Sequence, residues 1–442
     1  MQIQLSDHFT YSRLLRFTFP AMVMMVFTSL YGVVDGLFVA NYAGKSALAA
    51  INFVYPIVNI LATFGYMFGT GGSALVAKTL GEGKKEKANQ LFSLFVYICT
   101  FVSVVFIVVG FFVLRPLMAY LGAEGTMLDE AVVYGNILLL AMPFWNLQFL
   151  FQIFFVTAER PKLGLYVTIL AGCTNMVLDA LFVAVFGWGL VGAAVATAIS
   201  QVVGGGLPLI YFFMENTSLL RLGKTVFDGK AVVKGTTNGL SELVSGVSGS
   251  LVATLYNVQL LNYVGEAGVA AYGVRMYIAF VFVGIFLGYA NGVAPVVGYH
   301  YGAENHAEMH NLLKKSIVLL GISSVLMLLV SEAMAVPLVS IFTGYDAELY
   351  ELTLHGFRIF SVSFLFSGMA IFGSSFFTAL NNGIISAVLS FLRTIVFQVV
   401  CVLIFPIFWG IDGIWYSLVV AEILAFLVTI ICLTVMRKYY HY

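Results

Sequence analysis

The chain has 442 residues, of which 61% are hydrophobic and only 10% are charged, and its formal net charge is zero. A soluble domain typically carries about 25% charged residues. A mean hydropathy of +1.00 therefore excludes a soluble fold of this length. The zero net charge gives no indication of a nucleic-acid partner. We expect a polytopic membrane protein whose main partner is the lipid bilayer.

Twelve apolar runs are long enough to cross a bilayer, which needs about 20 such residues per helix. The first run is too long for the apolar core of a signal peptide, so we expect it to be retained as a spanning helix. The expected structure is all-α and integral to the membrane, with twelve transmembrane helices. They are predicted over residues 14–40, 48–76, 91–114, 129–156, 163–186, 190–213, 235–261, 269–297, 314–336, 351–378, 384–408 and 411–436.

The basic residues of the predicted loops are unevenly distributed between the two sides of the membrane. Nearly all fall on one side, and only Lys45 and Arg115 fall on the other. Because Lys and Arg in short loops mark the cytoplasmic side, we expect a multi-pass protein of the cell membrane with both termini in the cytoplasm. Residues 1–214 then form an N-terminal six-helix lobe, residues 215–234 a cytoplasmic linker and residues 235–442 a C-terminal six-helix lobe.

The second half of the chain repeats the first at an offset of 221 residues, half of the full length. Without any gap, Gly81 matches Gly302, and Trp188–Gly189 matches Trp409–Gly410. The matches fall largely on residues that end or bend helices. An even number of helices returns each half to its starting side, so this parallel repeat predicts two pseudo-symmetric bundles related by an axis along the membrane normal.

The acidic residues inside the predicted helices do not repeat. Asp35 and Asp179 correspond to Tyr256 and Val400 at the same offset. A charged residue near the bilayer centre costs roughly 2.5–3.5 kcal/mol on insertion scales, so such residues are functional by default. A scaffold that repeats while its acids do not is typical of a duplicated transporter.

The oxygen-bearing side chains of the first half form a candidate cation site. At a rise of 1.5 Å per residue, Asp35, Asp179 and Thr197 lie roughly 9–12 Å below the outer surface. Asn175 precedes Asp179 by one helical turn and shares its face, and Tyr134 is a further candidate near the outer end of its helix. Carboxylate, amide and hydroxyl oxygens suit a hard cation or a bound proton. The alternative is a polar network that only holds helices together, and two acids at matched depth favour the cation site.

Pro20 lies in the first predicted helix, on the inner side of Asp35. Proline removes one backbone hydrogen bond and permits a kink. Two interpretations stay open: a hinge that responds to Asp35, or a static kink at the start of the helix.

The second half carries different polar residues inside its predicted helices. Their depths are counted from the inner surface of the membrane. Glu242 and Arg393 lie at similar depth, and Arg393 has two candidate partners, Glu242 and Glu422. One interpretation is a structural ion pair. The other is a pocket for a cationic substrate in which Glu242 is the counter-charge. Gly284, Gly288 and Gly292 form a face of small residues that predicts close approach of another helix.

Other motifs give weaker signals. The four cysteines lie in apolar runs without metal spacing, and a solvated loop is a better interpretation of His306 and His310 than a zinc site. The chain has no phosphate-binding loop and no nucleophile elbow. We therefore expect no cofactor, no metal and no enzymatic activity.

Together these features resemble the multidrug and toxic compound extrusion (MATE) transporters, particularly a bacterial branch of that family. The resemblance covers essentially the whole chain. The motifs that carry it are Pro20 with Tyr31-Gly-Val-Val-Asp35, the loop Gly81-Glu-Gly-Lys84, Asn175-x-x-x-Asp179, and Thr197.

The resemblance implies antiport, in which an inward cation gradient drives export of amphipathic, often cationic compounds. It implies that Asp35, Asn175, Asp179 and Thr197 line a cation-linked site in the N-terminal lobe, and that Pro20 is associated with bending of the first helix. Some members also use acids on helices 7 and 10. Glu242 fits the first of these roles, whereas helix 10 has no mid-membrane acid here, which departs from the family pattern.

Our hypothesis is a secondary multidrug exporter that works by alternating access, as a monomer with a central cavity lined by aromatic and Met side chains. The coupling ion is H⁺ or Na⁺, because the same carboxylates serve both. One alternative is a lipid-linked oligosaccharide flippase of the same superfamily, which needs a basic cavity. Another is an integral-membrane enzyme, which needs a reactive His, Ser or metal at depth. A passive channel fits the asymmetric halves poorly.

Overall fold

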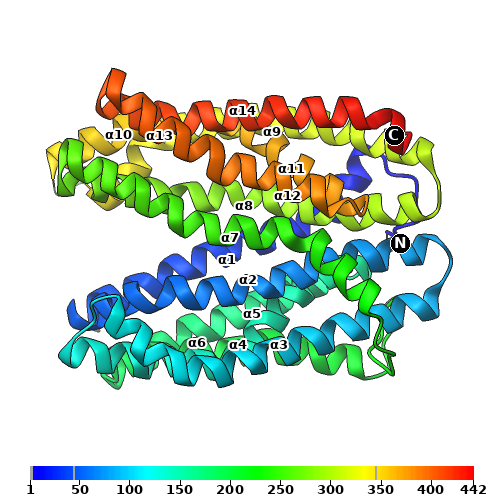
Figure 1. Cartoon of the computed structure of the whole chain (residues 1–442), viewed down its shortest axis with the longest axis horizontal. Helices are drawn as coiled ribbons and strands as arrows, with labels where there is room; N and C mark the ends of the chain where they lie inside the picture. The colour runs from blue at the N-terminus through cyan, green and yellow to red at the C-terminus, as the bar shows by residue number, and fades with distance from the viewer. Residues whose placement is uncertain (1–2, 43–44, 344–345) are drawn as a thin grey trace.

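A computed structural model describes residues 3–42, 45–343 and 346–442. Within these residues the chain is helical, with fourteen α-helices and two π-helical segments, η1 and η2 (Figure 1). The elements are α1 (Tyr11–Tyr42), α2 (Lys45–Gly81), α3 (Lys85–Tyr120), α4 (Gly125–Thr157), α5 (Pro161–Asp179), η1 (Ala180–Val185), α6 (Gly189–Phe213), α7 (Gly229–Val264), α8 (Glu266–Gly302), α9 (His306–Thr343), α10 (Ala347–Ser361), α11 (Phe364–Ala379), α12 (Gly383–Phe391), η2 (Leu392–Val396), α13 (Phe397–Trp409) and α14 (Ile411–Tyr440).

The lengths and composition of these helices confirm the predicted membrane architecture. Among the described residues, eleven helical stretches are long and apolar enough to cross a membrane, and the bent pair α10 and α11 makes a twelfth. This pair corresponds to the single helix predicted over residues 351–378, and its two parts meet at 53°. Ser361 bonds back to the carbonyl of Arg358 at 2.7 Å, and Ser367 to that of Ser363 at 2.9 Å. Such back-bonding competes with the helical pattern and bends helices.

The helices pack as two bundles that lie side by side (Figure 1). We call α1–α6 with η1 the N-lobe, and α7–α14 with η2 the C-lobe. Both chain termini lie at one end of the molecule, the terminal face, and the opposite end is the distal face. The side chains of Phe112 on α3 and Ile322 on α9 are largely exposed, as expected for helices that face lipid.

The two lobes meet backbone to backbone near the terminal face. A Cβ atom on Gly81 of α2 would overlap the carbonyl oxygen of Tyr299 on α8, and one on Gly302 of α8 would overlap that of Lys78 on α2. Gly81 and Gly302 are the pair matched by the 221-residue offset. The repeat therefore supplies both halves of a reciprocal contact that only glycine permits.

The predicted face of small residues on α8 receives α1. A Cβ atom on Gly288 would meet the backbone of Met22, and one on Gly292 would lie 2.9 Å from Cβ of Thr18. This contact confirms the expected close helix approach. Pro20 is buried between these two contacts, and α1 continues as a helix through it. The side chain of Lys45, used above to predict orientation, lies outside the described residues.

The segment before α1 connects the two lobes at the terminal face. The backbone N–H of Leu5 donates to Glu159 of the N-lobe at 2.6 Å, and that of Phe9 donates to Glu308 of the C-lobe at 2.9 Å. Nδ1 of His8 also lies 2.7 Å from Glu308. Both Leu5 and Phe9 are fully buried. The first residues of the chain thus hold the terminal ends of the lobes together.

We predict that Gly81→Ala forces the lobes apart at the terminal face. The added methyl group has no free volume, and overpacking of this kind costs about 1–3 kcal/mol. Thermal unfolding of the purified protein in detergent should begin at a lower temperature than for the unsubstituted chain. Gly321→Ala on α9 is the matched control, because a Cβ there meets nothing within 4 Å. Equal unfolding temperatures for the two variants would contradict the packing argument.

Candidate functional site

Asp35 of α1 and Asp179 of α5 meet inside the N-lobe. Their carboxyl groups lie within hydrogen-bonding range of each other, and Asp179 is fully buried. Neither oxygen of Asp179 nor Oδ1 of Asp35 has a hydrogen-bond donor among the described residues. Two ionised carboxylates have no proton to share and repel each other. The contact is favourable only when the pair holds a proton or a cation.

The remaining residues of the predicted cation site surround this acid pair. Nδ2 of Asn175, one turn before Asp179, donates to Oγ1 of Thr197 on α6 at 3.5 Å. Tyr134 of α4 is buried, and its hydroxyl lies close enough to both carboxyl groups to interact with them electrostatically. The structure therefore brings together, from four helices, all five residues that the sequence singled out by depth.

A π-helical segment begins directly after Asp179. It covers residues 180–185 within a helix predicted as continuous over 163–186. The segment ends at a turn in which Trp188 stacks on Phe182, with ring centroids 4.9 Å apart. A π-helical turn is rare and is frequently found at functional sites. Here it adjoins the buried carboxylate, and nothing in the hydropathy pattern indicates it.

Three further residues near the acid pair received no role from the sequence. The hydroxyl groups of Tyr31 on α1 and Tyr55 on α2 lie close enough to Asp35 to interact with it electrostatically. The side chain of Gln148 on α4 hydrogen bonds with Tyr31. Aromatic and amide residues are common in apolar helices, so only their positions in space reveal them as neighbours of the site.

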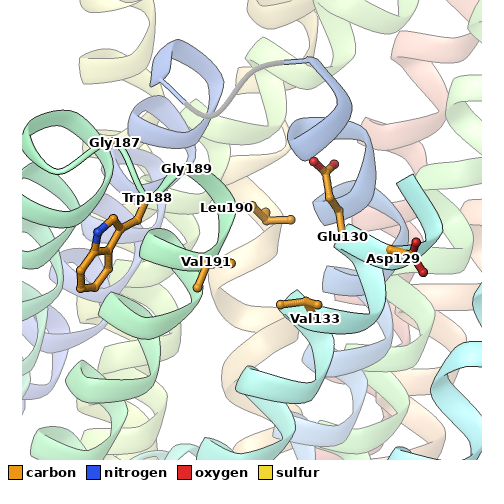
Figure 2. Close-up of a pocket in the computed structure, with 8 residues that line it drawn as sticks. All are labelled: Asp129, Glu130, Val133, Gly187, Trp188, Gly189, Leu190 and Val191. Atoms are coloured by element: carbon orange, nitrogen blue, oxygen red, sulfur yellow. The ribbon is translucent and has the colours of Figure 1, made fainter. Parts of the chain in front are cut away.

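An open pocket of about 370 Å³ lies at the distal end of the N-lobe, between the start of α4 and the turn before α6 (Figure 2). Glu130 and Trp188 lie on opposite sides of it. Glu130 precedes Tyr134 by one turn of α4, and Leu190 precedes Thr197 by two turns of α6, so each pair shares a helix face. The pocket therefore lies on the distal side of the acid pair, along α4 and α6, which carry Tyr134 and Thr197.

Comparison with known proteins identifies the family. The family model described as MatE matches residues 20–181 and 247–404 of the chain. The chain belongs to the MATE family. The resemblance inferred from the motifs is thereby confirmed, and with it a transporter function instead of an enzymatic one. A lipid-linked oligosaccharide flippase is not favoured.

Relatives and solved structures of this family cover nearly the whole chain. The multidrug export protein MepA of Staphylococcus saprophyticus subsp. saprophyticus is 24% identical over 429 residues, 96% of this chain and 93% of that protein. A crystal structure of a MATE protein in complex with MaL6 superposes with a TM-score of 0.92, 22% identity and 98% coverage of both chains. An outward-facing multidrug resistance MATE transporter of the MOP superfamily superposes with a TM-score of 0.91, 22% identity and the same coverage.

In this MATE protein, Arg393 pairs with Glu422 and not with Glu242. Nε of Arg393 donates to both carboxylate oxygens of Glu422, at 3.0 and 3.1 Å, and a terminal guanidinium nitrogen lies 3.0 Å from one of them. Arg393 lies in η2, the second π-helical segment. Glu242 is half-buried and has no hydrogen bond or ion pair with any described residue. The geometry favours a structural role for Arg393 and leaves Glu242 as an unpaired acid.

We predict that Glu422→Gln destabilises the C-lobe more than Glu242→Gln does. The first variant leaves the guanidinium of Arg393 without its partner in a mostly buried position, and breaking such a pair costs on the order of 3 kcal/mol. The second removes an acid that has no partner to lose. Unfolding of both purified variants in detergent, followed by tryptophan fluorescence against temperature, compares the two. A lower midpoint for Glu242→Gln than for Glu422→Gln would contradict this assignment.

Proposed function

We propose that this protein is a cation-coupled multidrug antiporter whose coupling site is the acid pair of the N-lobe. The observation that carries the proposal is the buried contact of Asp35 with Asp179. Among the described residues, no hydrogen-bond donor reaches Oδ1 of Asp35 or either oxygen of Asp179. A pair that needs a proton or a cation to be stable exchanges that ion with whichever side it can reach. Either H⁺ or Na⁺ satisfies this requirement.

We infer that the terminal face is cytoplasmic, in accordance with the basic residues of its loops. The lobes meet there through Gly81 and Gly302, so this state is closed on the cytoplasmic side. The distal pocket at Glu130 and Trp188 then lies on the external side of the acid pair. In this arrangement the site exchanges ions with the outside, and the opposite arrangement of the lobes releases them inside.

Ion binding alters the contact between α1 and α5. When the acid pair is charged and empty, repulsion between Asp35 and Asp179 pushes the two helices apart, whereas a bound proton or cation draws them together. Pro20 is the hinge through which α1 transmits this change, because its lost hydrogen bond permits bending where α1 crosses the glycine face of α8. Ion and drug favour different lobe arrangements, and this difference in affinity couples their transport.

The drug site lies between the lobes, around Glu242. The charge of Glu242 on α7 acts on the hydroxyl of Tyr66 on α2, so this acid faces the N-lobe. The ring of Tyr66 stacks on Phe149 with centroids 4.2 Å apart, and its hydroxyl lies 3.8 Å from Sδ of Met25. An unpaired carboxylate beside aromatic rings and a thioether is a site for an amphipathic organic cation. A monomer contains all of these residues.

We predict that Asp35→Asn abolishes gradient-driven efflux while the protein still inserts. The amide removes one of the two ionisable groups and can donate a hydrogen bond to Asp179, so the site no longer needs a proton or a cation to be stable. Efflux of a fluorescent organic cation from proteoliposomes, driven by a pH gradient or a Na⁺ gradient applied separately, measures the effect and identifies the ion. Glu215→Gln, at an exposed acid paired with Arg221, is the control and should transport normally. Full efflux by Asp35→Asn would remove the acid pair from the mechanism.

We predict that Glu242→Gln selectively weakens transport of cationic substrates. Loss of the counter-charge should raise the KM for a permanently charged compound about tenfold, since one favourable charge contact is worth about 1 kcal/mol or more. The KM for an uncharged amphipathic compound should change little. Initial rates in proteoliposomes with the two compounds separate the effects. An equal loss for both would assign Glu242 to ion coupling or packing instead.

A further inference from the structure

The C-lobe contains a neutral counterpart of the acid pair. Tyr256 on α7 occupies the position that the 221-residue offset assigns to Asp35. Its hydroxyl lies 2.7 Å from Oε1 of Gln398 on α13 and 3.0 Å from Oγ of Ser417 on α14. In the repeat, α7 corresponds to α1, the run α12, η2 and α13 corresponds to α5 with η1, and α14 corresponds to α6. These three oxygens therefore lie in the C-lobe where the cation site lies in the N-lobe, but none of them belongs to an acid.

A buried arginine lies beside this counterpart. The side chain of Arg275 on α8 is only 6% exposed, and its guanidinium lies 4.5 Å from the ring centre of Tyr272 and 4.4 Å from that of Phe360. Its Nε has no hydrogen-bond partner, and no acid in the described part of the chain lies within ion-pair distance of it. Its electrostatic support comes from these two aromatic faces and from the hydroxyl of Tyr272.

Arg275 is connected to Tyr256 through a single ring. Tyr272 stacks on Tyr256 with centroids 5.3 Å apart and planes within 9° of parallel, and its other neighbour is the guanidinium. The charge of Arg275 is close enough to act on the hydroxyl of Tyr256. Arg275 also follows the distal start of α8 at Glu266 by nine residues, or roughly 14 Å. This depth is comparable with that of the acid pair in the N-lobe.

We propose that Arg275 is a resident positive charge that keeps cations out of the C-lobe counterpart, so that the protein couples transport through one cation site only. The statement that transport is coupled through one cation site rests on the proposed function of the acid pair. The oxygens of Tyr256, Gln398 and Ser417 are the chemical class that binds a hard cation. A fixed guanidinium beside them disfavours any second positive charge by about ten- to a thousandfold, the effect of one nearby charge on an ionisation equilibrium.

The charge at this position is tested by placing an acid in the counterpart site. In Tyr256→Asp, Arg275 should hold the new carboxylate in its ionised form, and the infrared spectrum of the purified protein at neutral pH should gain no protonated-carboxyl band. In Tyr256→Asp with Arg275→Met the buried acid loses its partner, so the band should appear. Tyr256→Asp with Arg393→Met and Glu422→Met is the matched control, because it removes another guanidinium of the C-lobe together with the acid that neutralises it. It should resemble Tyr256→Asp alone.

Cation exclusion is measured separately with radioactive Na⁺ as the probe. All variants are made in an Asp35→Asn/Asp179→Asn background, so that any bound ion lies outside the N-lobe site. The variant with Tyr256→Asp and Arg275→Met should bind Na⁺ at least tenfold more tightly than the variant with Tyr256→Asp alone. Neither experiment requires the acid pair to be the coupling site, so a failure of the proposed function leaves this test intact.

The outcomes separate a charge effect from a packing effect. Identical infrared spectra and Na⁺ affinities with and without Arg275 would overturn the proposal and leave Arg275 as a packing residue. Arg275→Lys in the Tyr256→Asp background keeps the charge and should suppress the band as arginine does. If Tyr256→Asp does not insert, the same comparison is made with Ser417→Asp, whose side chain contacts the Tyr256 hydroxyl directly.

Discussion

The N-lobe holds Asp35 and Asp179 side by side in surroundings that supply neither buried oxygen of Asp179 with a hydrogen-bond donor. An apolar bundle tolerates such a pair only if a positive charge or a proton joins it. The arrangement of the site follows from this constraint. Asn175, Thr197 and Tyr134 add oxygens around the pair from α5, α6 and α4. Under the proposed function, the stability of this lobe depends on ion occupancy, which is the property that an antiporter requires.

Counting residues along helices predicted much of this site, because depth in a membrane is fixed by the helical rise. Asp35, Asp179 and Thr197 were placed at one level by their distance from helix ends, and the structure brings them together. The choice of Glu422 over Glu242 as partner of Arg393 depends on how α14 packs against η2, and no local pattern contains that information. The hydropathy pattern likewise gives no sign of the π-helical segments or of the bend before α11.

The two lobes have similar backbone arrangements, but they carry different charges at equivalent depth. Among the described residues, the acid pair of the N-lobe has no ion-pair partner, and Arg275 of the C-lobe has no acid within ion-pair distance. Neither arrangement is favourable by itself in a low-dielectric interior. The acid pair can be relieved by a diffusing ion, whereas the arginine is supported permanently by Tyr272 and Phe360. Under these two proposals, duplication followed by such divergence gives the transporter one exchangeable charge and one fixed charge.

The contact between Gly81 and Gly302 has a consequence for leakage. A barrier built from side chains can open briefly when one of them changes rotamer, which takes nanoseconds or less at exposed positions. Here Gly81 lies against the carbonyl of Tyr299, and Gly302 against that of Lys78, so this contact is backbone against backbone and has no side chain that can rotate away. It opens only when α2 and α8 separate along their length, a collective motion of microseconds to milliseconds. The glycines thus make fast, uncoupled passage of small ions improbable at this end of the protein.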